Sequence, residues 1–306
     1  MAPNIIHFIY VGGRAFSFIH FLAVYTAYKV NKPEQIYFHH TEEPSGKWWD
    51  MARPLLKLNR VAPVNEIFGN PVIYPAHKAD IIRLEMLRQF GGIYLDLDII
   101  SINPFKPLLK YNFVMGIEPG TGLCNAVIIA SKDAPFLELW QEKYKTFNKD
   151  LWNFHSVILP GKMAKEFPEL IYLADKYNFF YPTHNDPVCE YLWGNKPNIK
   201  SLAIRMGKNL VMLVTMWLKR DQDPIKLAFY ETFHGLHGKE WHYSRAQKSY
   251  CIHLWEGLWG KPYLDQLSPE YLQSNPSNFA RLMRNIIPMD ELEAMAKGQP
   301  IALPMS

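Results

Sequence analysis

The chain has 306 residues and 48% of them are hydrophobic, which is enough for a substantial core in one large α/β domain or two small ones. Its net charge is only +4 with a pI near 8.7, and its lysines and arginines are scattered along the chain. Scattered charge argues against nucleic acid as the main partner. It is compatible with positive charge being required only at one local site.

Strands and helices are expected to alternate through the first hundred residues. Apolar runs and helical spacing predict strands over 4–10, 35–40, 64–68 and 92–97, and helices over 15–29, 46–58 and 76–90. This alternation indicates a nucleotide-binding sheet with covering helices, where a ligand sits at the carboxyl ends of the strands. Later segments predict helices over 135–147 and 156–166, a loop at 181–187 and a helical, proline-punctuated tail from 265 to 306.

The segment from Ala79 to Ile100 is the most informative, because it runs from a helix through a glycine stop into a strand with two aspartates. In an extended strand the alternate residues Asp96 and Asp98 point to one face, and the apolar residues between them point to the other. Two carboxylates together repel each other, and burying them without compensation costs on the order of several kcal/mol. A hard divalent cation held by oxygen ligands explains the pair.

An Asp-x-Asp triplet also has simpler interpretations. Such triplets often solvate turns, but turn aspartates are normally flanked by Gly, Ser, Asn or Pro, and these are flanked by Tyr, Leu and Ile. An aspartate-dependent phosphatase needs Gly or Thr soon after the second aspartate, where this chain has Ile99, Ile100 and Ser101. The nearby Asp80 and Arg83, three residues apart on the predicted helix, can form a plain intrahelical ion pair.

Four blocks of sequence resemble, in order, glycosyltransferases with the DXD sugar-binding region. This family includes fungal initiating mannosyltransferases and, more distantly, the glucosylating bacterial toxins. The blocks are residues 4–13, 79–98, 124–130 and 253–259. The resemblance implies an α/β fold of the GT-A type, with a Rossmann-like nucleotide-binding sheet, covering helices and a helical elaboration on the acceptor side. It implies one domain with a nucleotide-sugar half over 1–130, an acceptor side and closing loop over 131–264, and a tail over 265–306.

The activity that the resemblance implies is transfer of a sugar from a nucleotide-sugar to an acceptor hydroxyl of a glycan, glycolipid or protein, with retention of configuration. A UDP-sugar is favoured by the toxin-like pattern of Asp80 and Arg83, and GDP-mannose stays open. The expected cofactor is Mn²⁺, with Mg²⁺ as the alternative. A catalytically silent protein that binds sugars or nucleotide-sugars also stays open, because binding and catalysis use the same pocket residues.

Roles for individual residues follow from the resemblance. Catalytic roles are implied for Asp80, Arg83, Asp96 and Asp98. Metal ligation is implied for Asp96, Asp98 and His253, whose imidazole would favour Mn²⁺ over Mg²⁺. Donor contacts are implied for His7, Tyr10, Gly12, Asn125, Trp255, Trp259 and Lys261. Tyr10 would stack on the nucleobase where the family often has tryptophan.

Targeting signals are not visible in the sequence. The first predicted strand begins almost at Met1, so we expect a cytoplasmic enzyme of bacterial or viral style, or a chain whose anchor has been removed. The apolar stretch over 210–218 is too short to span a bilayer and predicts a buried helix or a surface for a lipid-linked acceptor. The three cysteines form no Cys-x-x-Cys pair, which argues against a disulfide framework or a structural zinc site.

Overall fold

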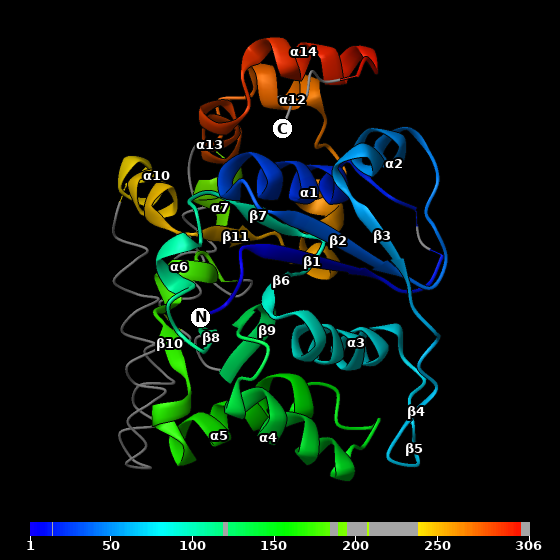
Figure 1. Cartoon of the computed structure of the whole chain (residues 1–306). Helices are drawn as coiled ribbons and strands as arrows, with labels where there is room; N and C mark the ends of the chain where they lie inside the picture. Colours follow the sequence, from blue (N-terminus) through cyan, green and yellow to red (C-terminus); the bar gives the residue numbers. More distant parts are fainter. Residues whose placement is uncertain (14, 119–121, 184–188, 195–206, 208–237, 301–306) are drawn as a thin grey trace.

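A computed structural model describes residues 1–13, 15–118, 122–183, 189–194, 207 and 238–300. Its centre is a seven-stranded sheet with the strand order β10-β8-β9-β6-β1-β2-β3 (Figure 1). The strands are β1 (Ile5–Tyr10), β2 (Gln35–His40), β3 (Lys57–Arg60), β6 (Gly92–Leu95), β8 (Phe113–Glu118), β9 (Gly122–Ala130) and β10 (Tyr172–Ala174). Strands β6, β1, β2 and β3 are parallel, and β9 runs against both of its neighbours.

Two short pairs of strands lie outside this sheet. Strand β7 (Ile99–Ser101) pairs antiparallel with β11 (Cys251–His253), and β4 (Glu66–Ile67) forms a hairpin with β5 (Asn70–Pro71). In the first pair His253 lies opposite Ile99. This pairing therefore brings a histidine from the last third of the chain beside the end of the Asp-x-Asp turn.

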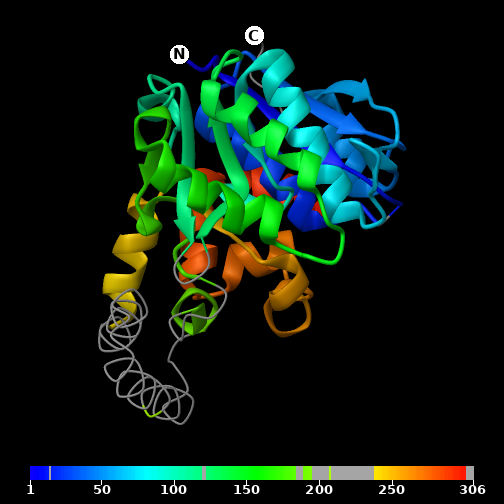
Figure 2. The ribbon, with the colours of Figure 1, turned by 90° about the horizontal axis from the view of Figure 1, so that it is seen from below.

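Helices cover both faces of the sheet. They are α1 (Phe18–Asn31), α2 (Lys47–Ala52), α3 (Pro75–Phe90), α4 (Pro135–Lys143), α5 (Leu159–Glu166), α6 (Lys176–Phe179), α7 (Cys189–Trp193), α10 (Lys239–Lys248), α11 (Glu256–Trp259), α12 (Pro269–Ser274), α13 (Asn278–Ile286) and α14 (Met289–Lys297). Helical turns are η1 (Arg53–Leu55), η2 (Lys106–Leu108), η3 (Tyr144–Thr146), η4 (Phe154–Ile158), η5 (Pro168–Leu170) and η6 (Gly260–Leu264). Helix α1 covers one face with α12 to α14 beyond it, and α3, α4 and α5 cover the other (Figures 1 and 2).

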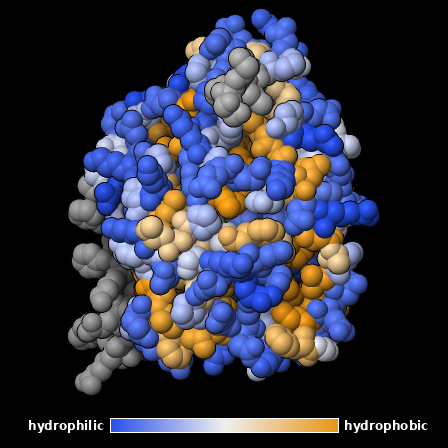
Figure 3. Space-filling model, in the orientation of Figure 1, coloured by the Kyte–Doolittle hydropathy of each residue, from blue (hydrophilic) through white to orange (hydrophobic). Residues whose placement is uncertain are grey.

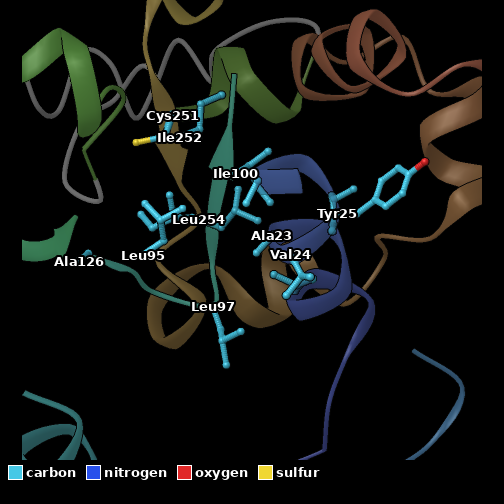
Figure 4. Packing of buried hydrophobic residues seen from close by; sticks show 14 of the residues in the cluster. Ala23, Val24, Tyr25, Leu95, Leu97, Ile100, Ala126, Cys251, Ile252 and Leu254 are labelled. Atoms are coloured by element: carbon cyan, nitrogen blue, oxygen red, sulfur yellow. The ribbon is translucent and has the colours of Figure 1, made fainter. Parts of the chain in front are cut away.

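The hydrophobic core consists of two main clusters, one on each face of the sheet. Neighbouring residues of β1 show the division, because Phe8 belongs to the α1 side and Ile9 to the α3 side. Figure 4 shows Leu95 and Leu97 in the first cluster, where residues of α1 and β11 pack around the same segment. Burial of these leucines fixes the backbone on either side of Asp96, so the turn that carries both aspartates is firmly anchored.

The α/β class and the Rossmann-like sheet of the GT-A type that the sequence predicts are confirmed, and within the described part of the predicted tail the chain forms α12, α13 and α14. Three predicted elements need correction. The predicted helix over 46–58 ends at Ala52, since Pro54 lies in the turn that follows, and the chain then enters β3, a strand too polar to show an apolar pattern. Of the predicted strand over 64–68, only the two residues of β4 are extended in a strand.

The strand predicted over 92–97 is also shorter than expected, because β6 ends at Leu95 and Asp96 to Asp98 form a turn. The two aspartates therefore lie beyond the strand end and not on its face. The apolar stretch at 210–218 and most of the predicted loop at 181–187 lie outside the described residues. Within the described part, no helix has the length and apolar character needed to cross a membrane.

Candidate functional site

The Asp-x-Asp turn lies at the carboxyl end of β6, next to β9 and β11. The backbone N–H of Asp96 donates to the carbonyl of Ala126 at 2.9 Å, and the N–H of Ile99 donates to the carbonyl of Asp96 at 3.0 Å. His253 reaches the turn from β11, with its Nε2 3.2 Å from Oδ2 of Asp98. One local turn and one long-range strand pairing thus gather two carboxylates and an imidazole.

These three groups have the arrangement of a metal site. Asp96, Asp98 and His253 can each offer one ligand atom, and the three atoms lie within 4.8 Å of one another. The Nδ1 atom of His253 is buried and has no hydrogen-bond partner among the described residues. Burial alone would lower the pKa of His253, but the charges of Asp98 and Asp96 outweigh this effect and raise it. The donor set of two carboxylates and one imidazole fits a divalent cation.

The side chain of Arg83 connects helix α3 to this turn. Its Nη1 lies 3.2 Å from Oδ1 of Asp96 and donates to the carbonyl of Asn125 at 2.7 Å, and its Nη2 lies 3.1 Å from Oδ1 of Asp80. The guanidinium also sits 4.4 Å from the ring centre of Tyr94. Burial opposes the charge of Arg83, but the carboxylates raise its pKa overall, so it stays a cation.

Asp80 and Asn125 complete this network from α3 and β9. The side-chain amide of Asn125 donates to Oδ1 of Asp80 at 2.8 Å, and both residues are buried. Burial raises the pKa of the Asp80 carboxyl, although the charge of Arg83 opposes that change. The structure therefore brings Asn125 of β9 to Asp80, Arg83 and Asp96, which all lie within residues 79–100, and all four were expected to contribute to one site.

Two glycines allow α3 and β6 to meet at this place. Gly91 follows the last residue of α3 with φ +66°, and Gly92 begins β6 with φ +110°. A Cβ atom on Gly92 would lie 2.5 Å from the carbonyl oxygen of Ile5, closer than any real side chain permits. Glycine at this position lets β6 pair directly with β1, which aligns the carboxyl ends of the two strands.

A cavity of about 660 Å³ opens at the same edge of the sheet. It lies at the carboxyl ends of β1, β2 and β3 and against the first turns of α3. Gly12, with φ +87°, forms part of its wall. The other lining residues are Val11, Thr41, Glu42, Arg60, Val61, Ala62, Pro63, Ile73, Pro75 and Lys78. This is the position where open α/β sheets bind nucleotides.

The structure places two predicted donor contacts in the core instead. His7 is fully buried, with its Nδ1 2.9 Å from Nε2 of His39 and its Nε2 2.8 Å from the carbonyl of Gly91. Burial lowers the pKa of His7 to about 4. Tyr10 packs against Phe38 on the α1 side of the sheet and is 3% exposed. A ligand role for His7 and base stacking by Tyr10 are corrected accordingly: both are packing residues here.

Of the donor contacts predicted for Trp255, Trp259 and Lys261, the structure places only Trp255 next to the three candidate metal ligands. The ring of Trp255 lies 3.8 Å from the ring of His253, but its indole N–H donates to the carbonyl of Pro182 at 3.4 Å. That N–H is therefore engaged within the protein. Trp259 is 3% exposed and belongs to the α1-side core. The side chain of Lys261, in η6, lies outside the described residues.

Two contacts to the aspartates were not anticipated from the sequence. The hydroxyl of Tyr94 donates to Oδ1 of Asp96 at 2.5 Å, and the backbone N–H of Glu256 donates to Oδ2 of Asp98 at 2.9 Å. Alternation along the strand gave a signal for Tyr94, since it precedes Asp96 by two residues. No local signal pointed to Glu256, because its contact depends on the distant pairing of β7 with β11.

Comparisons with known proteins agree with this geometry. Residues 33–114 match the family described as "Glycosyltransferase sugar-binding region containing DXD motif". The chain is 31% identical over 310 residues to glucan organizing enzyme 1 of Cryptococcus neoformans var. grubii, covering 95% of this chain and 72% of that protein. It is 38% identical over 64 residues to inositol phosphoceramide mannosyltransferase 3 of Schizosaccharomyces pombe, covering 21% and 18%. The solved structure of the WbbM bifunctional glycosyltransferase has a TM-score of 0.46 at 10% identity, covering 97% of this chain and 52% of that one.

Proposed function

Because the chain belongs to the glycosyltransferases whose sugar-binding region contains the DXD motif, we propose that it transfers a sugar from a nucleotide-sugar to an acceptor hydroxyl in a metal-dependent reaction. The supporting observation is the gathering of Asp96, Asp98 and His253 within 4.8 Å, beside the buried Arg83. At this edge of the sheet the carboxylates can hold a cation and the guanidinium supplies a fixed positive charge. A diphosphate ligand needs both kinds of positive charge nearby.

Asp96, Asp98 and His253 would hold the cation. When bound, a divalent cation neutralises negative charge on the departing diphosphate. The imidazole ligand favours Mn²⁺ over Mg²⁺. Tyr94 and Arg83 both contact Oδ1 of Asp96, so among the described residues Oδ2 is the oxygen left to face a ligand. These outer contacts orient the carboxylate in the way that supporting groups orient metal ligands.

Arg83 would stabilise the leaving group directly. Breaking the bond between the sugar and the diphosphate places negative charge on the phosphate oxygens, and a fixed cation in a dry site stabilises that charge effectively. The contacts of Arg83 with Asp80 and Asp96 position its guanidinium before a substrate arrives. Asp80 and Asn125 would then accept from and donate to the hydroxyls of the donor sugar.

The cavity beside Gly12 would take the nucleoside of the donor. Glycine there lets the backbone approach a ligand closely. The pattern of Asp80 and Arg83 favours a UDP-sugar as the donor. The name of the mannosyltransferase relative favours mannose, so GDP-mannose is the second candidate donor. The relative named for organising glucan supports a glycan as the acceptor. We also propose that the whole chain acts as one domain, with 1–130 binding the donor.

We expect the transfer to retain the anomeric configuration. The acceptor hydroxyl would attack from the face that the diphosphate leaves, and a phosphate oxygen would accept the hydroxyl proton, so no dedicated base is needed. The new bond forms between the acceptor oxygen and the anomeric carbon as the bond to the diphosphate breaks. Detection of a glycosylated Asp or Glu during turnover would refute this route.

Release of nucleoside diphosphate tests the function. The wild-type chain is incubated with MnCl₂ and a panel of UDP- and GDP-sugars, and free diphosphate is measured without and with oligosaccharide acceptors. We expect release with at least one donor and none with Asp98→Asn, while Asp133→Asn, a change at an exposed aspartate far along the chain, behaves as wild type. Intact donors across the whole panel, despite binding, would indicate a silent sugar-binding protein.

A further inference from the structure

An exposed hydrophobic patch adjoins the proposed donor site. Its members are Ile73, Tyr74, Leu151 and Trp152, which are 57%, 42%, 46% and 60% exposed. They come from two distant segments, one just before α3 and one between η3 and η4. On the face seen in Figure 3, hydrophobic surface gathers over the region that lies below α3 in Figure 1. Exposed aromatic residues gathered in this way commonly mark a binding surface.

The two aromatic rings of the patch are held in place from beneath. His77, which is 2% exposed, donates through Nε2 to the carbonyl oxygen of Trp152 at 3.0 Å, and the two rings are 5.2 Å apart. The rings of Trp152 and Tyr74 meet edge to face, 5.7 Å apart at 70°. Trp152 is therefore exposed and yet fixed by a buried residue, as expected of a ligand platform.

The patch and the proposed sugar pocket share one helix face. His77, Asp80 and Arg83 follow one another at three-residue intervals on α3, so His77, which holds Trp152, lies about one helical turn from Asp80, roughly 5 Å along the axis. Ile73 also lines the cavity beside Gly12. Through Ile73 the patch is continuous with the cavity proposed for the nucleoside, so the aromatic pair lies beside the proposed donor site.

The chemistry of the patch fits a neutral carbohydrate. A pyranose ring presents a face of C–H groups that packs against an aromatic ring, and two rings at a steep angle can hold one sugar from two sides. Close to the aromatic pair, Lys149 is paired with Asp150 at 2.7 Å, so the two charges beside Trp152 offset each other.

We infer that Tyr74 and Trp152 form a subsite that stacks a pyranose ring of the acceptor glycan. That the bound glycan is an acceptor rests on the proposed function. That Tyr74 and Trp152 bind a glycan rests only on the geometry of the patch. His77 acts as a positioning residue beneath the subsite.

Binding of neutral oligosaccharides to the full chain tests the subsite without donor or metal. Mannotriose, laminaritriose and maltotriose are the probes, and affinity is measured by saturation-transfer NMR. We expect Trp152→Ala and Tyr74→Ala each to weaken binding of the preferred probe about tenfold, and Trp152→Phe to retain most of it. The matched control is Phe68→Ala, because Phe68 is a 54% exposed aromatic residue at the β4–β5 turn.

Several outcomes would overturn the inference. They are equal affinity of Trp152→Ala and wild type, absence of binding of all three probes, and sedimentation with phosphatidylcholine–phosphatidylserine vesicles that depends on Trp152 while oligosaccharide binding does not. Where transfer is measurable, the KM for the acceptor should rise more than the KM for the donor in Trp152→Ala. Trp152-dependent glycan binding by a chain that releases no nucleoside diphosphate would support the subsite and contradict the transferase.

Discussion

Removal of the charge of Arg83 should destabilise the fold strongly, because Arg83 compensates two carboxylates. Arg83→Met keeps the length of the side chain and leaves Asp80, whose side chain is 10% exposed, without its cation. Breaking a buried pair by removing one partner costs about 3–5 kcal/mol. Asp96 adds less, since its side chain is 28% exposed and partly solvated. We therefore expect Arg83→Met to lower the free energy of unfolding by about 3–5 kcal/mol at pH 7.

A double-mutant cycle, with stability measured by urea unfolding, tests whether the uncompensated charge of Asp80 causes that loss. Asp80→Asn removes the uncompensated charge, so the double variant Asp80→Asn/Arg83→Met should lose about 1–3 kcal/mol less than the sum of the single losses. Burial already raises the pKa of Asp80, and removing Arg83 takes away the main opposing effect. In folded Arg83→Met, Asp80 then binds a proton more tightly than it does in the unfolded chain. The loss in free energy of unfolding relative to wild type should therefore shrink as the pH falls from 7 to 5.

A surface arginine on the same helix is the matched control. Arg88 pairs with Glu85 at 2.7 Å, and both side chains are about half exposed. Arg88→Met should cost less than about 1 kcal/mol. A loss below about 1 kcal/mol for Arg83→Met, or strictly additive losses in the cycle, would refute the view that Arg83 compensates buried carboxylates.

Three further predictions concern the site and the core. Asp98→Asn should abolish metal-stimulated release of diphosphate while the melting temperature stays within a few degrees of wild type; retained activity in this variant would contradict metal ligation by Asp98. Treatment with EDTA should remove activity, and Mn²⁺ should restore it better than Mg²⁺, which a titration of each ion would show. Burial lowers the pKa of His7 to about 4 and of His39 to about 3. Just below pH 6.5 both imidazoles therefore bind protons in the unfolded chain but stay neutral in the folded chain. Stability should fall from pH 6.5 toward pH 4, by up to about 1.4 kcal/mol per pH unit for each histidine, and a flat urea-unfolding profile there would contradict it.

Local patterns made the centre of the site predictable. The helix of Asp80 and Arg83, the glycine stop and the strand before Asp96 lie within one continuous segment, where side-chain periodicity carries the information. A donor contact for Asn125 followed from the resemblance, and the structure places Asn125 beside Asp80 because β9 pairs with β6. Metal ligation by His253 was also implied by the resemblance, through residues 253–259, and the structure brings His253 to the turn because β11 pairs with β7.

The errors have physical reasons as well. His7 and Tyr10 were assigned to the ligand through the resemblance of residues 4–13, but both faces of this sheet are covered, so side chains along β1 are buried in the core. The platform at Tyr74 and Trp152 was missed because its two segments are 78 positions apart and neither carries a motif. Only the folded chain places them beside one another.

Anomalous X-ray scattering at the manganese edge tests the central claim most directly, on crystals of the chain soaked with MnCl₂ and UDP or GDP. We predict one strong peak within coordinating distance of Asp96, Asp98 and His253, next to the diphosphate density and facing Arg83. A manganese peak at a different place, or diphosphate bound with no peak at these three residues, would contradict the proposed metal-dependent transfer.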